Sequence, residues 1–419
     1  MQTWHVTFVV FLAGLLPSTA LATNGLNMIG FGTESVAMGG ADVAVARDTT
    51  ALNTNPAGLS NIGDQALDLF SAVAYALDVG HADSFGNDAS VDNKLIGLGG
   101  FGYARRLQGM PLVVGVGLFA QGGAGNVYKN LATPFGGRDD LSSLFRIAKL
   151  SFGGAWQPNQ RLSLGASLAL IYADIQQKVF PETSVVGFSG YQIEGPHVLK
   201  PGLKVGVQYR LRPDLTLGAT YTTATDLPLA GGHLTANLAA QGLGKVTYSD
   251  VRLTGLSLPQ EVALGLAWQA SQPLLLSFKL AWLNWADALK SSRLNARNPD
   301  NPAAPAEIVG VSTLNWRDQY VLALGMDYAL DARTHLLAGY NYGRNPVPAE
   351  HTQPLLAATA EHHLTFGVER LGEGNWRETF AVEFQPGNTV RYANPELPFG
   401  ASEERNRNVA LHFMLSRRW

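Results

Sequence analysis

The stretch RLSLGASLALIYA, residues 161–173, alternates large and small side chains. The larger side chains form one face: Leu162, Leu164, Ala166, Leu168, Leu170 and Tyr172. The other face carries Ser163, Gly165, Ser167 and Ala169. A period of two is the pattern of a β-strand, and the small face lacks the long charged side chains that a soluble sandwich presents to water. The stretch therefore predicts a strand of a transmembrane barrel, with lipid on one side and a crowded lumen on the other.

Similar alternation continues from about residue 66 to the end of the chain, and clusters of Gly, Asn, Asp and Pro separate the runs. We predict an all-β chain with a 14-stranded antiparallel transmembrane β-barrel. The expected strands are 66–80, 94–106, 110–122, 143–157, 161–178, 199–211, 214–227, 245–269, 273–287, 314–330, 334–345, 361–371, 375–386 and 407–419. The strand over 245–269 is taken to continue through Pro259, since a break there would give an odd number.

Short connections follow the even-numbered strands and long connections follow the odd-numbered ones. Bacterial barrels place short turns in the periplasm and long loops outside, so both chain ends are expected on the periplasmic side. In the strand near 199–211, Lys204 and Arg210 are expected to face the lumen. Trp419 ends the chain with the kind of aromatic residue that the barrel-assembly machinery reads. Expected surroundings are the outer membrane of a Gram-negative cell, with its lipopolysaccharide.

Composition argues against several other classes of protein. The chain has 46 glycines, 15% charged residues and no cysteine, which excludes disulfides and thiolate metal sites. Its 30 basic and 33 acidic residues provide no cationic surface for nucleic acid. Beyond the amino-terminal segment, no stretch approaches the roughly 20 apolar residues of a membrane helix.

Candidate catalytic and metal motifs lack the structural context that they require. Residues 97–102, GLGGFG, have the spacing of a dinucleotide fingerprint, but they lie in a strand pattern without a following helix. His362 and His363 are adjacent in a strand, so their side chains should point to opposite faces. No residue stands out as a nucleophile with its base. We expect no cofactor, no metal site and no enzyme activity.

The amino terminus predicts a cleaved signal peptide over residues 1–22. Residues 8–16 are apolar apart from Gly14, and Ala20-Leu21-Ala22 offers the small residues that signal peptidase recognises. Residues 1–5 depart from the usual pattern because they contain no Lys or Arg. The alternative is a membrane anchor, but about ten apolar residues are too few to cross a bilayer.

A segment over residues 23–65 separates the predicted signal from the barrel of residues 66–419. It is rich in glycine and carries enough apolar residues, among them Leu26, Met28 and Phe31, to have something to bury. A wide barrel would otherwise hold water, so we predict that this segment plugs the lumen as a hatch.

Several short motifs, in this order along the chain, resemble the FadL family of outer-membrane transporters for long-chain fatty acids and aromatic hydrocarbons. The motifs are Gly39-Gly40-Ala41, Ala46-Arg47-Asp48, Asn55-Pro56-Ala57-Gly58-Leu59, Phe119-Ala120-Gln121-Gly122-Gly123, Leu256-Ser257-Leu258-Pro259 and Asn345-Pro346-Val347-Pro348. The resemblance implies a monomeric barrel closed by an amino-terminal hatch, with lateral release of the ligand through a kink in the third strand. Gly122, Gly123 and Gly125 follow the third apolar run and are expected to form that kink, although an ordinary hairpin exit is the alternative.

Candidate gating and ligand-binding residues follow from this resemblance and from the chemistry of a fatty acid. Gating is assigned to the kink glycines and to the hatch residues Asn55 and Pro56. The hatch contacts are Leu26, Met28 and Phe31, and the outer-loop contacts, within 124–140 and 180–197, are Phe135 and Phe188. A carboxylate in a poorly hydrated pocket needs a cation, for which Lys178 and Lys290 are the candidates. The alternative is that both are solvated loop lysines without a role in ligand binding.

We predict passive transport of hydrophobic small molecules across the outer membrane, with long-chain fatty acids as the favoured ligand. The same fold would also allow uptake of aromatic hydrocarbons or export of lipids. A strand pattern of this kind is compatible as well with a general diffusion porin and with a structural or adhesion barrel. The plug argues against a porin, because an open pore would not need it.

Overall fold

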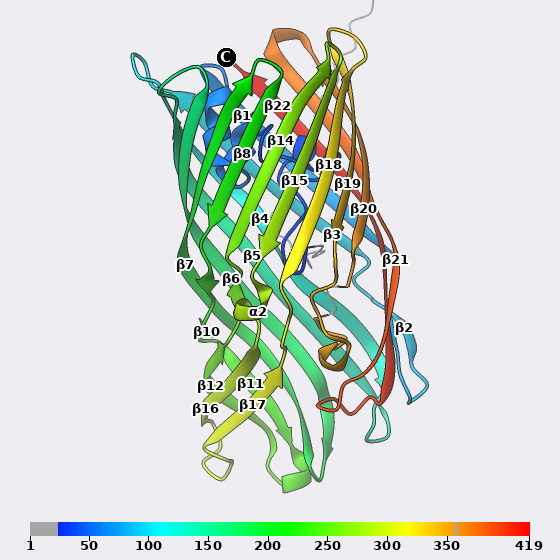
Figure 1. The fold of residues 1–419 in the computed structure, drawn as a ribbon. Coiled ribbons are helices and arrows are strands. Elements are labelled where there is room, and N and C mark those ends of the chain that lie inside the picture. Colours follow the sequence, from blue (N-terminus) through cyan, green and yellow to red (C-terminus); the bar gives the residue numbers. More distant parts are fainter. Residues whose placement is uncertain (1–23, 357–358) are drawn as a thin grey trace, which may run out of the picture.

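The computed structural model describes residues 24–356 and 359–419, so the predicted signal peptide lies outside the described residues. Figure 1 shows a tall barrel whose wall encloses the first described segment, drawn in blue. Among the described residues, no helix is long and apolar enough to cross a membrane.

Fourteen strands within the described residues close the barrel, and each pairs antiparallel with the next. They are β1 (Gln65–Ala82), β3 (Leu95–Arg106), β4 (Leu112–Ala132), β5 (Arg138–Trp156), β6 (Leu162–Val185), β7 (Phe188–Arg212), β8 (Leu215–Thr222), β14 (Glu261–Ser271), β15 (Leu274–Leu283), β18 (Gln319–Ala329), β19 (Thr334–Gly343), β20 (His362–Leu371), β21 (Trp376–Ala393) and β22 (Ala401–Arg418). The last strand pairs with the first from Ala66↔Arg418 to Ala82↔Glu403, which closes the ring. The predicted fold class is confirmed.

The beginning and the end of the barrel meet at one rim, which we call the terminal rim. There Trp419 accepts a hydrogen bond from the Asp64 amide and donates its own amide to the Gln65 carbonyl. The short turns after β3, β5, β7, β14, β18 and β20 lie at this rim. Long connections lie at the opposite, distal end after β8, β15 and β19, as predicted, whereas those after β4, β6 and β21 are shorter than the predicted gaps because these strands extend further.

The distal end contains more strand than the sequence indicated. β6 and β7 run on to a tight turn at 186–187, so the predicted loop over 180–197 is mostly strand, and β4 and β5 likewise extend through much of 124–140. Further short strands lie beyond the barrel wall: β2 (Asp88–Ser90), β9 (Thr225–Asp226), β10 (Leu229–Ala230), β11 (His233–Leu238), β12 (Gly244–Thr254), β13 (Ser257–Leu258), β16 (Ser291–Pro299) and β17 (Glu307–Thr313).

The expectation of one continuous strand over 245–269 is wrong. The chain is broken into β12, β13 and β14, because Gly255 takes a φ of 87° and Pro259 has no amide hydrogen to donate. The even strand count survives because the broken segments still form one arm of a long hairpin: β14 pairs with β8, β13 with β9, and β12 with β10 and β11.

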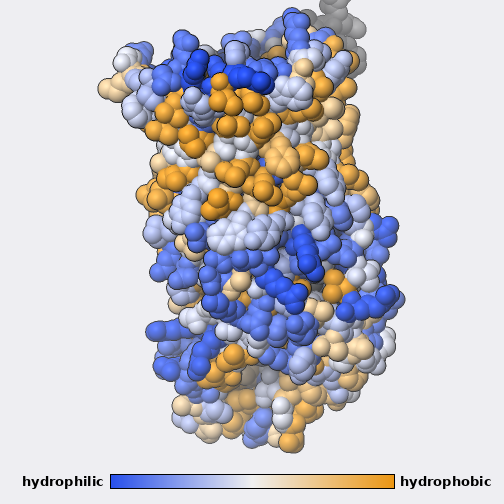
Figure 2. Space-filling view, viewed as in Figure 1, coloured by the Kyte–Doolittle hydropathy of each residue, from blue (hydrophilic) through white to orange (hydrophobic). Residues whose placement is uncertain are grey.

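The two faces of the wall differ as the alternation predicted. Leu164, Leu168, Leu170 and Tyr172 are exposed on the outside, whereas Ser163 and Ser167 are buried inside. Figure 2 shows the result on one side of the molecule as a hydrophobic band below the polar terminal rim, followed by a more polar region with smaller hydrophobic patches towards the distal end. This band is the part of the wall that faces lipid.

The segment of residues 24–64 fills the lumen and forms only short helices, α1 (Thr33–Ala37), η1 (Thr49–Leu52) and η2 (Pro56–Asn61). Small polar side chains of the inner wall bind its backbone: the Ser163 hydroxyl donates to the Ala57 carbonyl at 2.8 Å, and the Ser167 hydroxyl donates to the Leu52 carbonyl at 2.7 Å. A Cβ atom on Gly165 would lie 2.2 Å from the Ala57 amide nitrogen. The small face of the opening stretch is therefore the docking surface for this segment, which we call the hatch.

The remaining short helices lie in connections: η3 (Ala239–Gln241), α2 (Trp285–Ala288), η4 (Ala349–His351) and η5 (Glu373–Asn375). Of these, α2 follows β15 directly and places the fully buried Trp285 against the start of the hatch. A Cβ atom on Gly25 would lie 2.6 Å from the Trp285 ring. The hatch thus begins in a tightly packed position inside the barrel.

Candidate functional site: two cavities beside a gap in the wall

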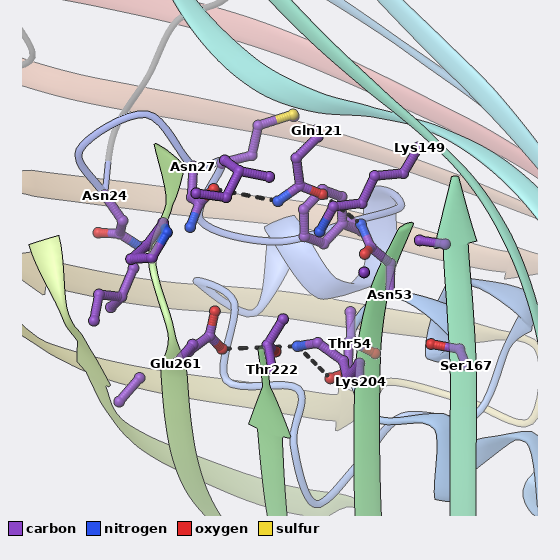
Figure 3. Close-up of a pocket in the computed structure, with 18 of the residues that line it drawn as sticks. Asn24, Asn27, Asn53, Thr54, Gln121, Lys149, Ser167, Lys204, Thr222 and Glu261 are labelled. Carbon is purple, nitrogen blue, oxygen red and sulfur yellow. Dashed lines mark hydrogen bonds and ion pairs between the residues drawn. The ribbon is translucent and has the colours of Figure 1, made fainter. Parts of the chain in front are cut away.

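A cavity with about 920 Å³ of open space lies between the hatch and the walls formed by β5, β6, β7, β14 and β15. Figure 3 shows its polar lining. Ionisable side chains reach it from both the hatch and the wall: Asp42, Lys149, Lys204, Glu261 and Lys279. We call it the large cavity.

Two of the three lysines in the large cavity are paired with carboxylates. Lys204 lies 3.7 Å from Glu261 and donates to the Thr54 carbonyl at 3.2 Å, and Lys279 lies 3.4 Å from Asp42. Lys149 is only 6% exposed and has no ion pair among the described residues. An ammonium group held away from bulk water without a counter-ion attracts an anion. The lining therefore carries one buried amine without a carboxylate partner among the described residues.

A chain of amide side chains borders the large cavity next to Lys149 (Figure 3). Asn53 donates to the Gln121 side-chain oxygen at 2.9 Å, and Gln121 in turn donates to the Asn27 side-chain oxygen at 3.2 Å. The chain links η1, β4 and the beginning of the hatch. Along one side of the large cavity, a ligand could therefore form hydrogen bonds with uncharged amide side chains.

The barrel wall has a gap between β3 and β4. Their pairing ends at Gly100↔Phe119, and β4 has a bulge between Ala120 and Gly122. Beyond the bulge, β4 pairs with the hatch: Asn27 bridges to Gly122, and the Gly123 amide donates to the Leu26 carbonyl at 3.1 Å. The hatch backbone thus occupies the place of the missing strand partner.

A second cavity, with about 340 Å³ of open space, lies at this gap and is called the small cavity. Its wall residues are Phe70, Ser71 and Ala72 of β1, Leu98 and Gly99 of β3, Ala120 of β4 and His412 of β22. On the hatch side, Met28, Gly30 and Phe31 line both cavities. A short loop of the hatch is therefore the partition between a polar cavity and a mostly apolar one.

The structure brings some of the predicted hatch residues to the cavities. Met28 and Phe31 form the partition, whereas Leu26 is buried beside the bulge and lines neither cavity. Asn55 fastens the hatch to the wall, because its side chain donates to the carbonyls of Val43 and Val207. Pro56 begins η2. Asn55 and Pro56 lie at the hatch–wall contact rather than at the gap.

The predicted kink glycines occupy different places. Gly122 lies at the bulge and Gly123 directly after it, with φ values of 150° and 140°. Gly125 lies further along β4, where its carbonyl accepts a hydrogen bond from the Asn93 side chain at 3.3 Å. The strand does not end at these residues, so the alternative of an ordinary hairpin exit is wrong.

The predicted outer contacts form an aromatic cluster at the distal end. Phe135 and Phe188 stack with ring centroids 4.2 Å apart, and Phe180 lies 6.3 Å from Phe188. Lys290 is exposed and pairs with Asp287 at 2.8 Å. Neither Lys290 nor Lys178 lines a described cavity. The predicted carboxylate contacts therefore stand apart from the cavity that carries the unpaired lysine.

Sequence reasoning missed Lys149, Lys279 and Glu261. Each lies on an inward-facing position of a strand, like Lys204, which was expected in the lumen and lines the large cavity. The signal that identifies them is parity: in β5, Lys149 shares a face with Ser151, which is also buried. Charged residues on the inner face of a barrel strand mark the lumen chemistry.

A pair of arginines ties the hatch to the wall near the terminal rim. Arg47 of the hatch lies 2.6 Å from both Glu34 and Asp327. Arg377 of β21 lies 3.9 Å from Glu34 of the hatch and 3.2 Å from Glu369 of β20. The Glu34 carboxylate, together with Asp327, raises the pKa of the Arg47 guanidinium above its ordinary value. Arg47 thus stays charged and joins the hatch to β18.

The fold and the site define a class of protein: a plugged outer-membrane β-barrel channel with internal cavities and an opening in its wall. A family model described as "Outer membrane protein transport protein (OMPP1/FadL/TodX)" matches residues 9–368. The chain belongs to this family of outer-membrane transporters for hydrophobic compounds. No curated protein matches the chain.

Solved structures share the fold at low sequence identity. The P. putida toluene transporter TodX superposes with a TM-score of 0.78 at 21% identity, over 94% of this chain and 99% of its own. The Ralstonia pickettii toluene transporter TbuX gives a TM-score of 0.73 at 20% identity, over 94% and 99%. A Pseudomonas aeruginosa FadL homologue gives 0.72 at 15% identity, over 94% and 98%.

Proposed function

We propose that this transporter carries long-chain fatty acids inward by passive diffusion, as a monomer. The observation that carries the proposal is the unpaired, buried Lys149 on the large cavity. A carboxylate would supply the missing negative charge, and a charge-assisted hydrogen bond stabilises such a contact by about 1.5–3 kcal/mol. A neutral hydrocarbon would leave Lys149 without a charged partner.

The proposed route has three stations. Ligand is captured at the distal aromatic cluster around Phe135 and Phe188, where stacked rings offer apolar surface. It then enters the large cavity, with its head group at Lys149. A shift of the partition at Met28 and Phe31 connects this cavity to the small one, from which the acyl chain leaves sideways through the gap between β3 and β4.

Uptake of small aromatic hydrocarbons is the second candidate. The small cavity favours it, because most of its lining is apolar, including Phe31, Phe70 and Leu98. A neutral ring would fit such a lining without a cation. The two candidates differ in whether transport depends on Lys149.

The discriminating experiment replaces Lys149 with Met and measures uptake of palmitate and of toluene by cells that lack other such transporters. We expect palmitate uptake to fall about tenfold or more, in line with the loss of one charge-assisted contact, and toluene uptake to stay unchanged. Lys290→Met is the matched control, because Lys290 is exposed and already paired with Asp287.

Two results would contradict the proposal. Undiminished palmitate uptake in a folded Lys149→Met barrel would remove the proposed head-group contact. A loss of palmitate uptake in Lys290→Met alone would move that contact to the distal loops. Folding is checked by the heat-dependent migration of the barrel on a gel.

A further inference from the structure

A buried cluster of titratable side chains lies on the inner wall outside the large cavity. His363 of β20, Glu383 of β21 and His412 of β22 come from three neighbouring strands. The Glu383 carboxylate accepts hydrogen bonds from His363 Nδ1 at 2.9 Å and from His412 Nε2 at 3.1 Å, and a third from the Gln385 side chain at 3.1 Å.

His412 differs from His363 in what surrounds its second nitrogen. The Nε2 atom of His363 is enclosed without a hydrogen-bond partner, whereas the His412 ring lines the small cavity. No residue in the described ranges forms a hydrogen bond with His412 Nδ1. One face of the cluster is therefore presented to whatever enters the small cavity.

The bond to Glu383 sets which nitrogen carries the proton when the His412 ring is neutral. A neutral imidazole that donates from Nε2 to a carboxylate keeps its Nδ1 atom unprotonated, so Nδ1 accepts a hydrogen bond. An anionic ligand would meet the negative charge of Glu383 directly behind the ring. Glu34 is the charged residue of α1, which packs against β20, β21 and β22, and it is paired with Arg47. The site therefore favours a neutral O–H donor over a carboxylate.

We propose that His412 is a second head-group station, which binds the ligand as a neutral acid, with the carboxyl O–H donating to Nδ1. This inference rests on the proposed fatty-acid function. The carboxylate that leaves Lys149 takes up one proton from a hydronium ion, which yields the carboxylic acid and water. Apolar surroundings favour this neutral form.

A neutral head group suits the position of the small cavity at the gap in the wall. Leu98, Gly99 and Ala120 border both the cavity and the gap. Moving a carboxylate from there into hydrocarbon would be very costly, whereas a neutral acid with one hydrogen bond to give up moves far more readily. The two stations thus present opposite preferences on the two sides of the Met28–Phe31 partition.

The test uses the purified full-length barrel in detergent and palmitic acid labelled with carbon-13 at the carboxyl carbon. Carbon NMR separates bound carboxylate from bound carboxylic acid. We expect both signals in the unchanged protein. His412→Gln should reduce the acid signal at least about tenfold and leave the carboxylate signal, since glutamine still donates an N–H to Glu383. His362→Gln is the matched control, because its exposed side chain lies outside the cavity.

A competition experiment gives a second readout without any substitution. Hexadecanol carries an O–H donor and should displace the acid signal, whereas methyl palmitate, which has no O–H, should not. Persistence of the acid signal in His412→Gln, its absence from the unchanged protein, or equal displacement by the ester would overturn the His412 station. Loss of the carboxylate signal in Lys149→Met tests the proposed function separately, and absence of any bound signal would overturn both.

Discussion

At the scale of single residues, Gly122 decides how the hatch meets the wall. A Cβ atom there would lie 2.0 Å from the Leu26 carbonyl oxygen, and the φ of 150° strains any other residue. We expect Gly122→Val to displace residues 26–27, to cost about 1–3 kcal/mol and to reduce ligand uptake. Thermal unfolding and palmitate uptake measure both effects.

Gly97→Val is the control for this substitution. Gly97 lies on the neighbouring strand β3, and nothing lies within 4 Å of the Cβ atom it would gain. Its uptake should match that of the unchanged protein. Normal uptake in a folded Gly122→Val barrel would show that the bulge has no part in the transport route.

The residue scale is also where the sequence was least informative. Lys149 and Lys290 are the same residue type, so the sequence alone gives them equal weight. The register of β5 is what places Lys149 against the hatch. Lys290 was predicted as a carboxylate contact because it follows the outer end of a strand, yet it is exposed and pairs with Asp287. A lysine that could bind a ligand carboxylate is recognised by the absence of a carboxylate partner nearby, and only the three-dimensional structure shows this.

At the scale of elements, Arg47 holds the hatch against β18. Its replacement by Met would leave the buried carboxylates of Glu34 and Asp327 without this partner. Breaking a fully buried pair costs roughly 3–5 kcal/mol, and partial solvent access to Arg47 reduces this to about 2 kcal/mol. We expect the hatch of Arg47→Met to become sensitive to limited proteolysis while the barrel remains closed.

The control is Arg212→Met, which removes an exposed ion pair with Asp214 in a turn at the terminal rim. An exposed pair contributes little, so proteolysis should not change. Equal protection of the hatch in both variants would show that hydroxyl contacts such as that of Ser163 suffice to hold it.

Elements of the barrel wall were predictable because lipid on one side and a hatch on the other impose alternation along β6 and its neighbours. Most of the distal strands escaped prediction because they are short and their alternation is irregular: β11 buries Leu234 and Ala236 but then also Asn237 and Leu238. The break at Gly255 and Pro259 was misread for a related reason. Pairing with β8 to β11 continues across the irregularity, and the sequence cannot show partners that lie elsewhere in the chain.

At the scale of the whole molecule, the barrel closes through strand pairs that leave the hatch out, apart from the bridge between Asn27 and Gly122. We expect a chain without residues 24–61 to fold as a barrel with an open lumen. Its conductance in planar bilayers should rise well above the low value expected of the full-length protein. A folded deletion variant with unchanged conductance would show that the distal loops, rather than the hatch, exclude ions.

Closure of the barrel depends on the pairing of β1 with β22, two strands at opposite ends of the chain. β1 therefore stays without its second partner until β22 is present, and any product truncated before β22 leaves β1 as an open sheet edge. Only a chain that includes β22 can cover the edge of β1, and a shorter copy stays open to pairing with strands of other chains.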